Sequence, residues 1–419
     1  MDGSGYWSLS KPNKRSFNEQ AFSVLVCALV ACQDFMTGPV MPWYEWTPVL
    51  DIKSALRYGC VPMASSTVEY SDVAAVRTGE ELDGARLAEY LRGKIEGADS
   101  GIKIQQFPSG HSNLTYLLEA GAREYVLRRG PLGPVAPKAH DMAREYQVLR
   151  AIHPHFSEAP NVFHLCDDPA VIGVVFYIME RRRGIILRDR IPRQMKRLPD
   201  HPRLVSEAFI DCMVRLHGID LQSSGLLALG KPQGFLERQV RGWGDRWQRS
   251  KTEDLPEMEF VIRWLDETLP SSPPPTLVHN DYKLDNVMLA TELPNRIEAV
   301  LDWEMATIGD PLADVGLTLC YWSWAAAPEL GSYGVKALTA KPGWYSRDEF
   351  ITRYAQRTGR DLTRIAYYEV LGIFKLAVIL QQIYYRFHRG QTSDARFRDF
   401  DSRVKELVKL AASLVERNG

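Results

Sequence analysis

Residues 277–289 read Leu-Val-His-Asn-Asp-Tyr-Lys-Leu-Asp-Asn-Val-Met-Leu, and they carry the strongest local signal in the chain. Apolar residues at both ends predict two short strands, and the polar middle predicts the loop between them. Within that loop, Asp281 is followed five residues later by Asn286. The loop is therefore expected to hold a carboxylate and a carboxamide close together.

The chain then turns over Glu292–Arg296 and returns as an apolar strand, Ile297–Leu301, which ends at Asp302. A carboxylate at the end of that strand is expected to point back at the loop. Taken singly, Asp281 has the alternative role of an ordinary turn residue, and Asp302 that of a helix cap. Their order and spacing within one hairpin make a chance match improbable.

This arrangement suits phosphoryl transfer, because its spacing is that of a kinase catalytic loop followed by a metal-binding Asp. Asp281 would accept or orient the proton of an attacking hydroxyl, while Asn286 and Asp302 would give Mg²⁺ the hard oxygen ligands it prefers. His279 and Lys283, in the same loop, are candidate catalytic residues beside Asp281. The expected cofactors are ATP and Mg²⁺.

Upstream, short strands joined by tight turns predict an antiparallel meander over residues 102–107, 114–119 and 124–129. A helix is expected over residues 140–152, and two more strands over residues 162–166 and 171–179. Such a small sheet would cover a nucleotide. The candidate nucleotide-binding residues are Ser109, Gly110, His111, Ser112, Asn113, Arg128, Glu145, Met179 and Glu180.

These candidates have different expected roles. Backbone N–H groups of the turn at residues 109–113 could cover phosphates, although an ordinary hairpin turn is an equal alternative. Arg128 would contact phosphate from the third strand, with Arg129 facing the opposite side. Glu145 would either pair with Arg128 or be a solvated helix charge. Met179 and Glu180 close the last strand, where adenine would meet the backbone.

From Val205 onward the pattern is mainly helical, and the long apolar segment Arg364–Arg386 is expected at the centre of a second lobe. The sequence thus predicts an α+β, two-lobed protein-kinase-like fold. Its small antiparallel β lobe would span residues 63–183 and its larger helical lobe residues 184–419.

Residues 1–62 lack periodic apolar structure and are interpreted as an extension outside the fold, with Met63 as an alternative natural start. Within them, an apolar stretch that ends at Cys32 and follows basic residues resembles an export signal, but it is short, and Asp2 and Glu19 make a poor n-region.

The bulk composition indicates a soluble chain without bias toward nucleic acid or membrane. The net charge is −1, and charged residues make up 25% of the 419 residues. No apolar run is expected to span a bilayer. Six cysteines at scattered positions suggest free thiols in a reducing compartment, so a cytoplasmic location is expected.

The motifs resemble a known family. The residues 279–286, with Asp302-Trp303-Glu304 and the segment Gly309–Asp314, are similar to the aminoglycoside phosphotransferase-like kinases. More narrowly, they resemble the kinase-like domain associated with acyl-CoA dehydrogenases. Tyr125–Arg129, with Arg in place of Lys, and Leu371–Ala377 fit that branch. The resemblance covers about residues 78–415.

The resemblance implies that Asp281 is the catalytic base, that Asn286 and Asp302 bind Mg²⁺, and that Arg128 contacts phosphate. It also implies bracing roles: His279 would orient the catalytic loop, and Asp310 and Asp314 would support the loop after the metal-binding Asp. Asn280 stands where the family usually has Gly. Asn is the next most tolerant residue if that position needs a positive φ.

The acceptor is expected to be a small anionic molecule, best a hydroxyacyl-CoA or a hydroxy acid. Arginines follow the last strand at positions 181–183, and basic residues outnumber acidic ones after Lys341, which disfavours a cationic antibiotic. A functional link to an acyl-CoA dehydrogenase is expected. The alternatives are an aminoglycoside-type antibiotic phosphotransferase and a nucleotide-binding pseudokinase. The aromatic residues Trp322, Trp324, Trp344, Tyr367 and Tyr368 would line an acyl groove or, by default, pack in the core.

Overall fold

The structure is a computed structural model. It describes residues 72–108, 113–131, 141–188, 190–193, 195–198, 200–292, 295–323, 338–392 and 394–418. The chain divides into two units, Met1–Glu69 and Tyr70–Gly419, and every described residue belongs to the second. The predicted extension over residues 1–62, the turn at residues 109–112 and Trp324 lie outside the described residues, and the predicted lobe boundaries stay a prediction.

A five-stranded antiparallel sheet forms the small lobe, with strand order β1-β2-β3-β5-β4. The meander is confirmed. The strands are β1 (Ile102–Gln106), β2 (Leu114–Ala120), β3 (Arg123–Arg129), β4 (Val162–Cys166) and β5 (Phe176–Glu180). The last strand is shorter than predicted because hydrogen bonds from Val171 to Asp168 and from Gly173 to Pro169 make a turn of its first half.

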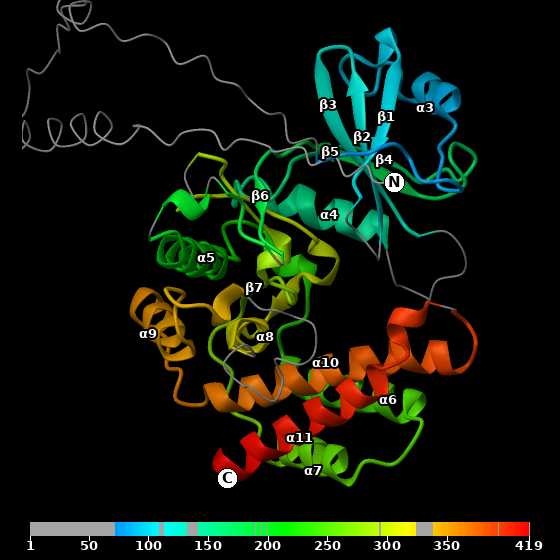
Figure 1. The fold of residues 1–419 in the computed structure, drawn as a ribbon. Coiled ribbons are helices and arrows are strands. Elements are labelled where there is room, and N and C mark those ends of the chain that lie inside the picture. Colours follow the sequence, from blue (N-terminus) through cyan, green and yellow to red (C-terminus); the bar gives the residue numbers. More distant parts are fainter. Residues whose placement is uncertain are drawn as a thin grey trace, which may run out of the picture. The chain divides into compact units, whose positions relative to one another are not determined.

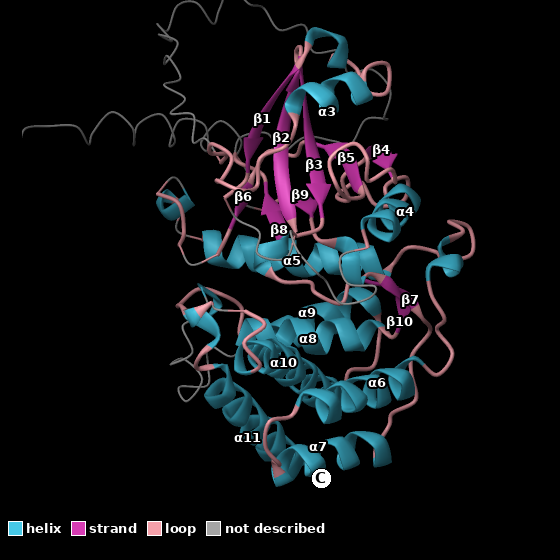
Figure 2. Ribbon diagram, turned by 90° about the vertical axis from the view of Figure 1, so that its right-hand side faces the viewer, coloured by secondary structure: helices cyan, strands magenta, loops and turns pink. Residues whose placement is uncertain are grey.

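Two helices cover this sheet, one on each face (Figures 1 and 2). Helix α3 (Gly84–Leu91) packs on the side of Leu127, and α4 (Met142–Ile152) packs on the side of Val126. The Asp83 side chain caps the start of α3 by accepting from the N–H of Arg86. Strand alternation therefore puts Arg128 on the α4 side of the sheet.

The helical lobe lies beyond the sheet in the sequence and contains two small strand groups. β6 (Ile185–Ile186), β8 (Val287–Leu289) and β9 (Ile297–Val300) form one, and β7 (Thr276–Val278) pairs with β10 (Thr307–Gly309) in the other. The predicted hairpin after the polar loop is thus confirmed as β8–β9. The helices are α5 (His201–His217), α6 (Phe235–Ser250), α7 (Pro256–Glu267), α8 (Pro311–Ser323), α9 (Arg347–Thr358), α10 (Ile365–His388) and α11 (Phe400–Asn418).

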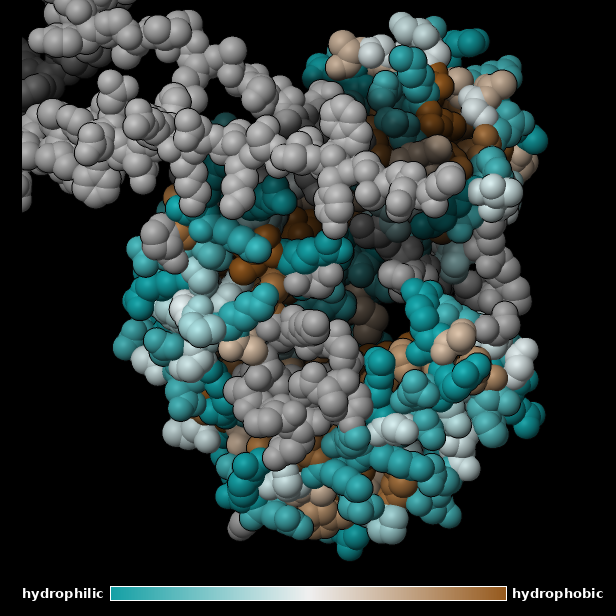
Figure 3. Space-filling view, viewed as in Figure 1, coloured by the Kyte–Doolittle hydropathy of each residue, from teal (hydrophilic) through white to brown (hydrophobic). Residues whose placement is uncertain are grey.

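Helix α10 is the centre of this lobe, as predicted, and it packs against α6, α7, α8 and α11. By length and composition it could cross a membrane, so the expectation that no apolar run reaches that length is wrong. Its most apolar window is 72% buried inside the structure. The face of this lobe seen in Figure 3 is mostly hydrophilic, in keeping with an apolar helix packed inside.

Two glycines allow α8 and α10 to approach closely. A Cβ on Gly316 would lie 2.4 Å from the backbone carbonyl of Tyr368, and one on Gly372 would lie 2.8 Å from Cys320 Sγ. This crossing places the first turn of α8, which carries Asp314, under the polar loop. The helix contact therefore sets the position of the candidate site.

We expect Gly316→Ala to lower the free energy of unfolding by about 3 kcal/mol, because the added methyl meets backbone that cannot move aside. Urea denaturation measures this. Gly244→Ala on α6 is the matched control, since the nearest atom to its added Cβ, Ile262 Cγ2, is 4.0 Å away. It should be neutral or stabilising by about 0.5–1 kcal/mol. Equal destabilisation of both variants would contradict the close crossing.

Candidate active site

The polar loop has an unusual backbone conformation. Asn280 has a φ of 63° and Asp302 a φ of 68°. Among the described residues, these two are the non-glycine residues with a positive φ. Asn and Asp tolerate this region better than other side chains because they are short and polar. The sequence-based expectation for Asn280 is confirmed. Strain of this kind often marks functional sites.

The carboxylate of Asp314 holds this loop from beneath. It accepts from the backbone N–H groups of His279 and Asn280, each at 2.7 Å, and lies 3.2 Å from His217 Nε2. Burial alone would raise the pKa of Asp314, but the hydrogen bonds from His217 and from the backbone N–H of His279 outweigh it and hold the pKa below its usual value. Asp314 therefore braces the loop of Asp281, rather than the loop after Asp302 as expected.

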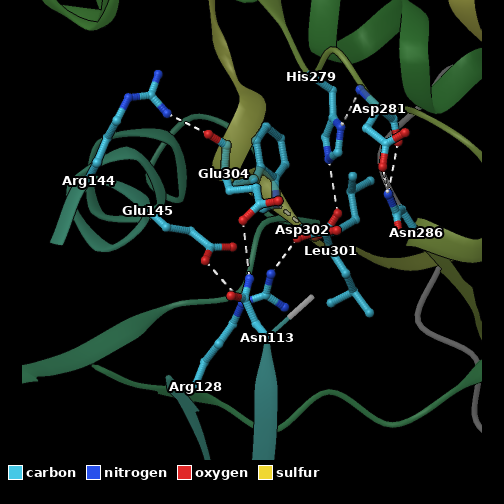
Figure 4. Close-up of polar contacts among 12 residues, drawn as sticks. Asn113, Arg128, Arg144, Glu145, His279, Asp281, Asn286, Leu301, Asp302 and Glu304 are labelled. Atoms are coloured by element: carbon cyan, nitrogen blue, oxygen red, sulfur yellow. Dashed lines mark hydrogen bonds and ion pairs between the residues drawn. The ribbon is translucent and has the colours of Figure 1, made fainter. Parts of the chain in front are cut away.

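His279 joins the loop to the returning strand through both ring nitrogens. Its Nδ1 accepts from the N–H of Asp281 at 3.3 Å, so its Nε2 carries the proton and donates to the carbonyl of Leu301 at 3.0 Å. Leu301 directly precedes Asp302. These contacts, which Figure 4 shows, are those that the predicted orienting function of His279 requires, and the function itself stays a prediction.

The carboxylate of Asp281 is held by three side chains. Lys283 Nζ lies 3.1 and 2.8 Å from its two oxygens, the Tyr321 hydroxyl donates at 3.1 Å, and Asn286 Nδ2 donates at 2.8 Å. Burial disfavours the charged form of Lys283, but the charge of Asp281 outweighs it and raises the lysine pKa. Tyr321 was missed because it lies near the end of the apolar helix α8, where an aromatic residue normally indicates packing.

The residues at this site fit a magnesium ion. The Nδ2 of Asn286 also donates to the carbonyl of Asp281 at 2.9 Å, so its amide is oriented with the oxygen available to a cation. Asp302 brings a carboxylate from the end of β9, and the two oxygens are hard ligands of the kind Mg²⁺ prefers. Phosphate and water would supply the remaining ligands, as is usual for this ion.

Arg128 reaches the same place from the small lobe. Its Nε lies 3.0 Å from Glu145, and its Nη2 pairs with Asp302 (Figure 4). Glu145 is buried, so its alternative role as a solvated helix charge is wrong. Burial raises the pKa of Glu145, and the charge of Arg128 opposes that shift. A guanidinium thus contacts the predicted metal ligand from the side where phosphate is expected.

Further contacts that sequence reasoning missed tie the small lobe to the segment after Asp302. Asn113 Nδ2 donates to Glu304 at 3.2 Å. Arg144 on α4 donates to the backbone carbonyl of Glu304 (Figure 4) and to that of Ala306, each at 2.6 Å. An Arg at a helix surface gives no local signal of such a partner, since the two lie 160 residues apart.

Other predicted residues have structural partners. Glu180 accepts from the N–H of Asn161 at 3.1 Å, and Met179 is buried in the sheet; their contact with adenine stays a prediction. Arginines 181–183 each pair with a carboxylate, and the side chain of Arg183 stays 70% exposed. The aromatic residues within the described part pack in the core: Trp322, Trp344, Tyr367 and Tyr368.

A small antiparallel sheet over a helical lobe, with an Asp–Asn loop facing an Asp at the end of a hairpin, defines a protein-kinase-like phosphotransferase. The model of the phosphotransferase enzyme family, APH, matches residues 103–366, and the chain belongs to this family. The fold and the kinase activity expected from the sequence are thereby confirmed.

Several known proteins are similar to this chain. Acyl-CoA dehydrogenase family member 10 from Mus musculus is 33% identical over 336 residues, covering 80% of this chain and 31% of that protein. Hygromycin-B 4-O-kinase from Escherichia coli is 26% identical, covering 80% of this chain and 89% of the other. A crystal structure of a "putative aminoglycoside phosphotransferase" from Ralstonia eutropha has a TM-score of 0.69 at 30% identity, covering 80% and 99%. The chain spans less than half the length of the acyl-CoA dehydrogenase family members it matches.

We expect Asp314→Asn to cost about 3 kcal/mol of stability at neutral pH, because an amide cannot replace the carboxylate that accepts two buried N–H groups. The sign of the pH effect follows from the lowered pKa. The stabilisation by Asp314 is complete above its unfolded pKa of about 3.9 and is lost as pH falls toward the lower folded pKa. The difference between wild type and variant should therefore shrink below about pH 4 in urea titrations. A difference that grows on acidification would contradict this bracing role.

Proposed function

We propose that this kinase uses ATP and Mg²⁺ to phosphorylate a hydroxyl of a small anionic acceptor, best a hydroxyacyl-CoA or a hydroxy acid. One observation carries the proposal. Asp281 and Asn286 are hydrogen-bonded to each other in a loop, and His279 of the same loop is hydrogen-bonded to Leu301, the residue before Asp302. This arrangement supports Asp281 as a proton acceptor that acts beside two hard oxygen ligands, those of Asn286 and Asp302. Such positioning supplies most of the catalysis in phosphoryl transfer.

The contacts of the residues support the following roles in the proposed reaction. Asp281 accepts the proton of the acceptor hydroxyl as that oxygen bonds to the γ-phosphorus and the bond to ADP breaks. Lys283 and Tyr321 fix the orientation of its carboxylate. Arg128, held by Glu145, contacts phosphate. Bound Mg²⁺ would neutralise charge on the phosphates, with Asn286 and Asp302 as its protein ligands.

The charges behind Asp281 support an anionic acceptor. Lys283 contacts its carboxylate, and Lys375 on α10 donates to the carbonyl of Asn280 at 3.0 Å. Lys375 and Arg246 both lie over the ring of Trp243, at 5.7 and 4.4 Å from its centroid. Asp281 offsets the charge of Lys283, and burial lowers the pKa of Lys375 to about 8. Arg246 is therefore the group whose charge would most attract a carboxylate or a coenzyme A phosphate and disfavour a polycationic sugar.

The named relatives favour the acyl acceptor over a free hydroxy acid. Phosphorylation turns a hydroxyl into a good leaving group, which would allow elimination before oxidation of the chain. That chemistry would link this kinase functionally to an acyl-CoA dehydrogenase, and we place it in the cytoplasm, where ATP is available. Phosphorylation of an aminoglycoside is the second candidate, because hygromycin-B 4-O-kinase is also a relative.

We expect Asp281→Asn to lower kcat by about 10²- to 10⁴-fold, because the variant cannot accept the proton. Nucleotide affinity and melting temperature should stay close to wild type, since the phosphate contacts remain. Steady-state kinetics with the best acceptor and calorimetric titration with AMP-PNP measure the two effects. Near-normal turnover would rule out Asp281 as the base.

A competition assay at fixed ATP and Mg²⁺ distinguishes the acceptors. We expect a hydroxyacyl-CoA to have the highest kcat/KM, a free hydroxy acid a lower one, and hygromycin B the lowest, because remote contacts to the coenzyme help hold the hydroxyl near the γ-phosphate. Product phosphate esters are counted by ³¹P NMR. If hygromycin B or another aminoglycoside is the best substrate, the second candidate function replaces the first.

A further inference from the structure

The segment after Asp302 presents three consecutive backbone carbonyls, and each of them accepts a hydrogen bond from a side chain. Arg144 donates to the first and the third, which belong to Glu304 and Ala306. The middle one, on Met305, accepts from Asn280 Nδ2 at 3.1 Å. The segment 304–306 is thus held from two sides, by helix α4 of the small lobe and by the loop of Asp281.

The backbone of Asn280 is held in place without the help of its side chain. Its N–H donates to Asp314 at 2.7 Å, and its carbonyl accepts from Lys375 at 3.0 Å. The residue is 9% exposed, and its φ of 63° is one that glycine adopts at least as easily as asparagine. The side chain of Asn280 can therefore be removed while the loop keeps its path.

Asp302 lies between two residues that are hydrogen-bonded to the loop of Asp281. His279 bonds to Leu301, the residue before Asp302, and Asn280 bonds to Met305, three residues after it. The proposed metal ligands come from both segments, with Asn286 on the loop and Asp302 between the attachments. A cation shared by the two needs their oxygens at a fixed separation.

We propose that Asn280 is a positioning residue whose amide, through Met305, sets the place of Asp302 relative to Asn286 and so strengthens Mg²⁺-dependent nucleotide binding. The inference rests on the proposed Mg²⁺- and ATP-dependent reaction. It assigns to the Asn280 side chain a function that a glycine at this position cannot supply. The alternative is that the bond to Met305 only stabilises the fold.

The test is Asn280→Gly in the full chain, with AMP-PNP as the probe. Mg²⁺ is expected to increase the affinity for AMP-PNP. The Mg²⁺ concentration at which half of this increase is reached should rise about three- to tenfold in the variant, which corresponds to the loss of one hydrogen bond. AMP-PNP affinity without Mg²⁺ and the melting temperature should stay close to wild type. With an accepted substrate, kcat should fall by a similar factor while the acceptor KM is unchanged.

Asn280→Ala is the matched control, because alanine also lacks the amide but is disfavoured at positive φ. It should show the same Mg²⁺ effect and, in addition, a lower melting temperature. An unchanged Mg²⁺ dependence in Asn280→Gly overturns the inference, and so does a Mg²⁺ effect that appears only together with an equal loss of stability. The binding measurement needs no acceptor, so it decides the inference even if no acyl substrate is found. If wild type binds AMP-PNP without any dependence on Mg²⁺, both the inference and the proposed function fail.

Discussion

The buried carboxylate of Asp314 is the group on which the catalytic loop depends. Its two hydrogen bonds of 2.7 Å fix consecutive backbone N–H groups, of His279 and Asn280, immediately before Asp281. The helix that carries it can lie at the right depth because Gly316 allows α8 to touch α10. Packing between two helices thereby helps to fix the position of Asp281, the proposed base. A buried charge of this kind is tolerable only because donors surround it.

From this loop, a small number of contacts extends to the rest of the site. His279 and Asn280 attach the loop to the chain on both sides of Asp302, and Arg144 attaches that same chain to the small lobe. Arg128 completes the connection by bonding to both Glu145 and Asp302. The residues proposed to act as the base, to bind the metal and to contact phosphate are thus connected by one network of hydrogen bonds and ion pairs. Separate lobes can then present them together, which is what in-line transfer of a phosphoryl group requires.

Sequence reasoning predicted the elements whose signal is local. The Asp–Asn spacing, the hairpin that returns to Asp302 and the strand alternation that separates Arg128 from Arg129 depend on near neighbours, and the structure contains all of them. The partners of Tyr321, Arg144 and Asp314 could not be predicted, because each contact joins residues that are distant in sequence. The same limit left alternatives open. Glu145 could not be distinguished from a solvated helix charge until its helix was packed on the sheet, and arginines 181–183 gave no local signal of their carboxylate partners.

The central claim is that Asp281, Asn286 and Asp302 form one phosphoryl-transfer site. A crystal structure of the wild-type protein with Mg²⁺ and AMP-PNP tests it most directly. We predict a magnesium ion bound by the amide oxygen of Asn286 and the carboxylate of Asp302, with Arg128 moved from Asp302 onto a phosphate and Asp281 facing the γ-phosphate across the acceptor position. A nucleotide bound elsewhere, or a metal held without Asn286 and Asp302, would contradict the account.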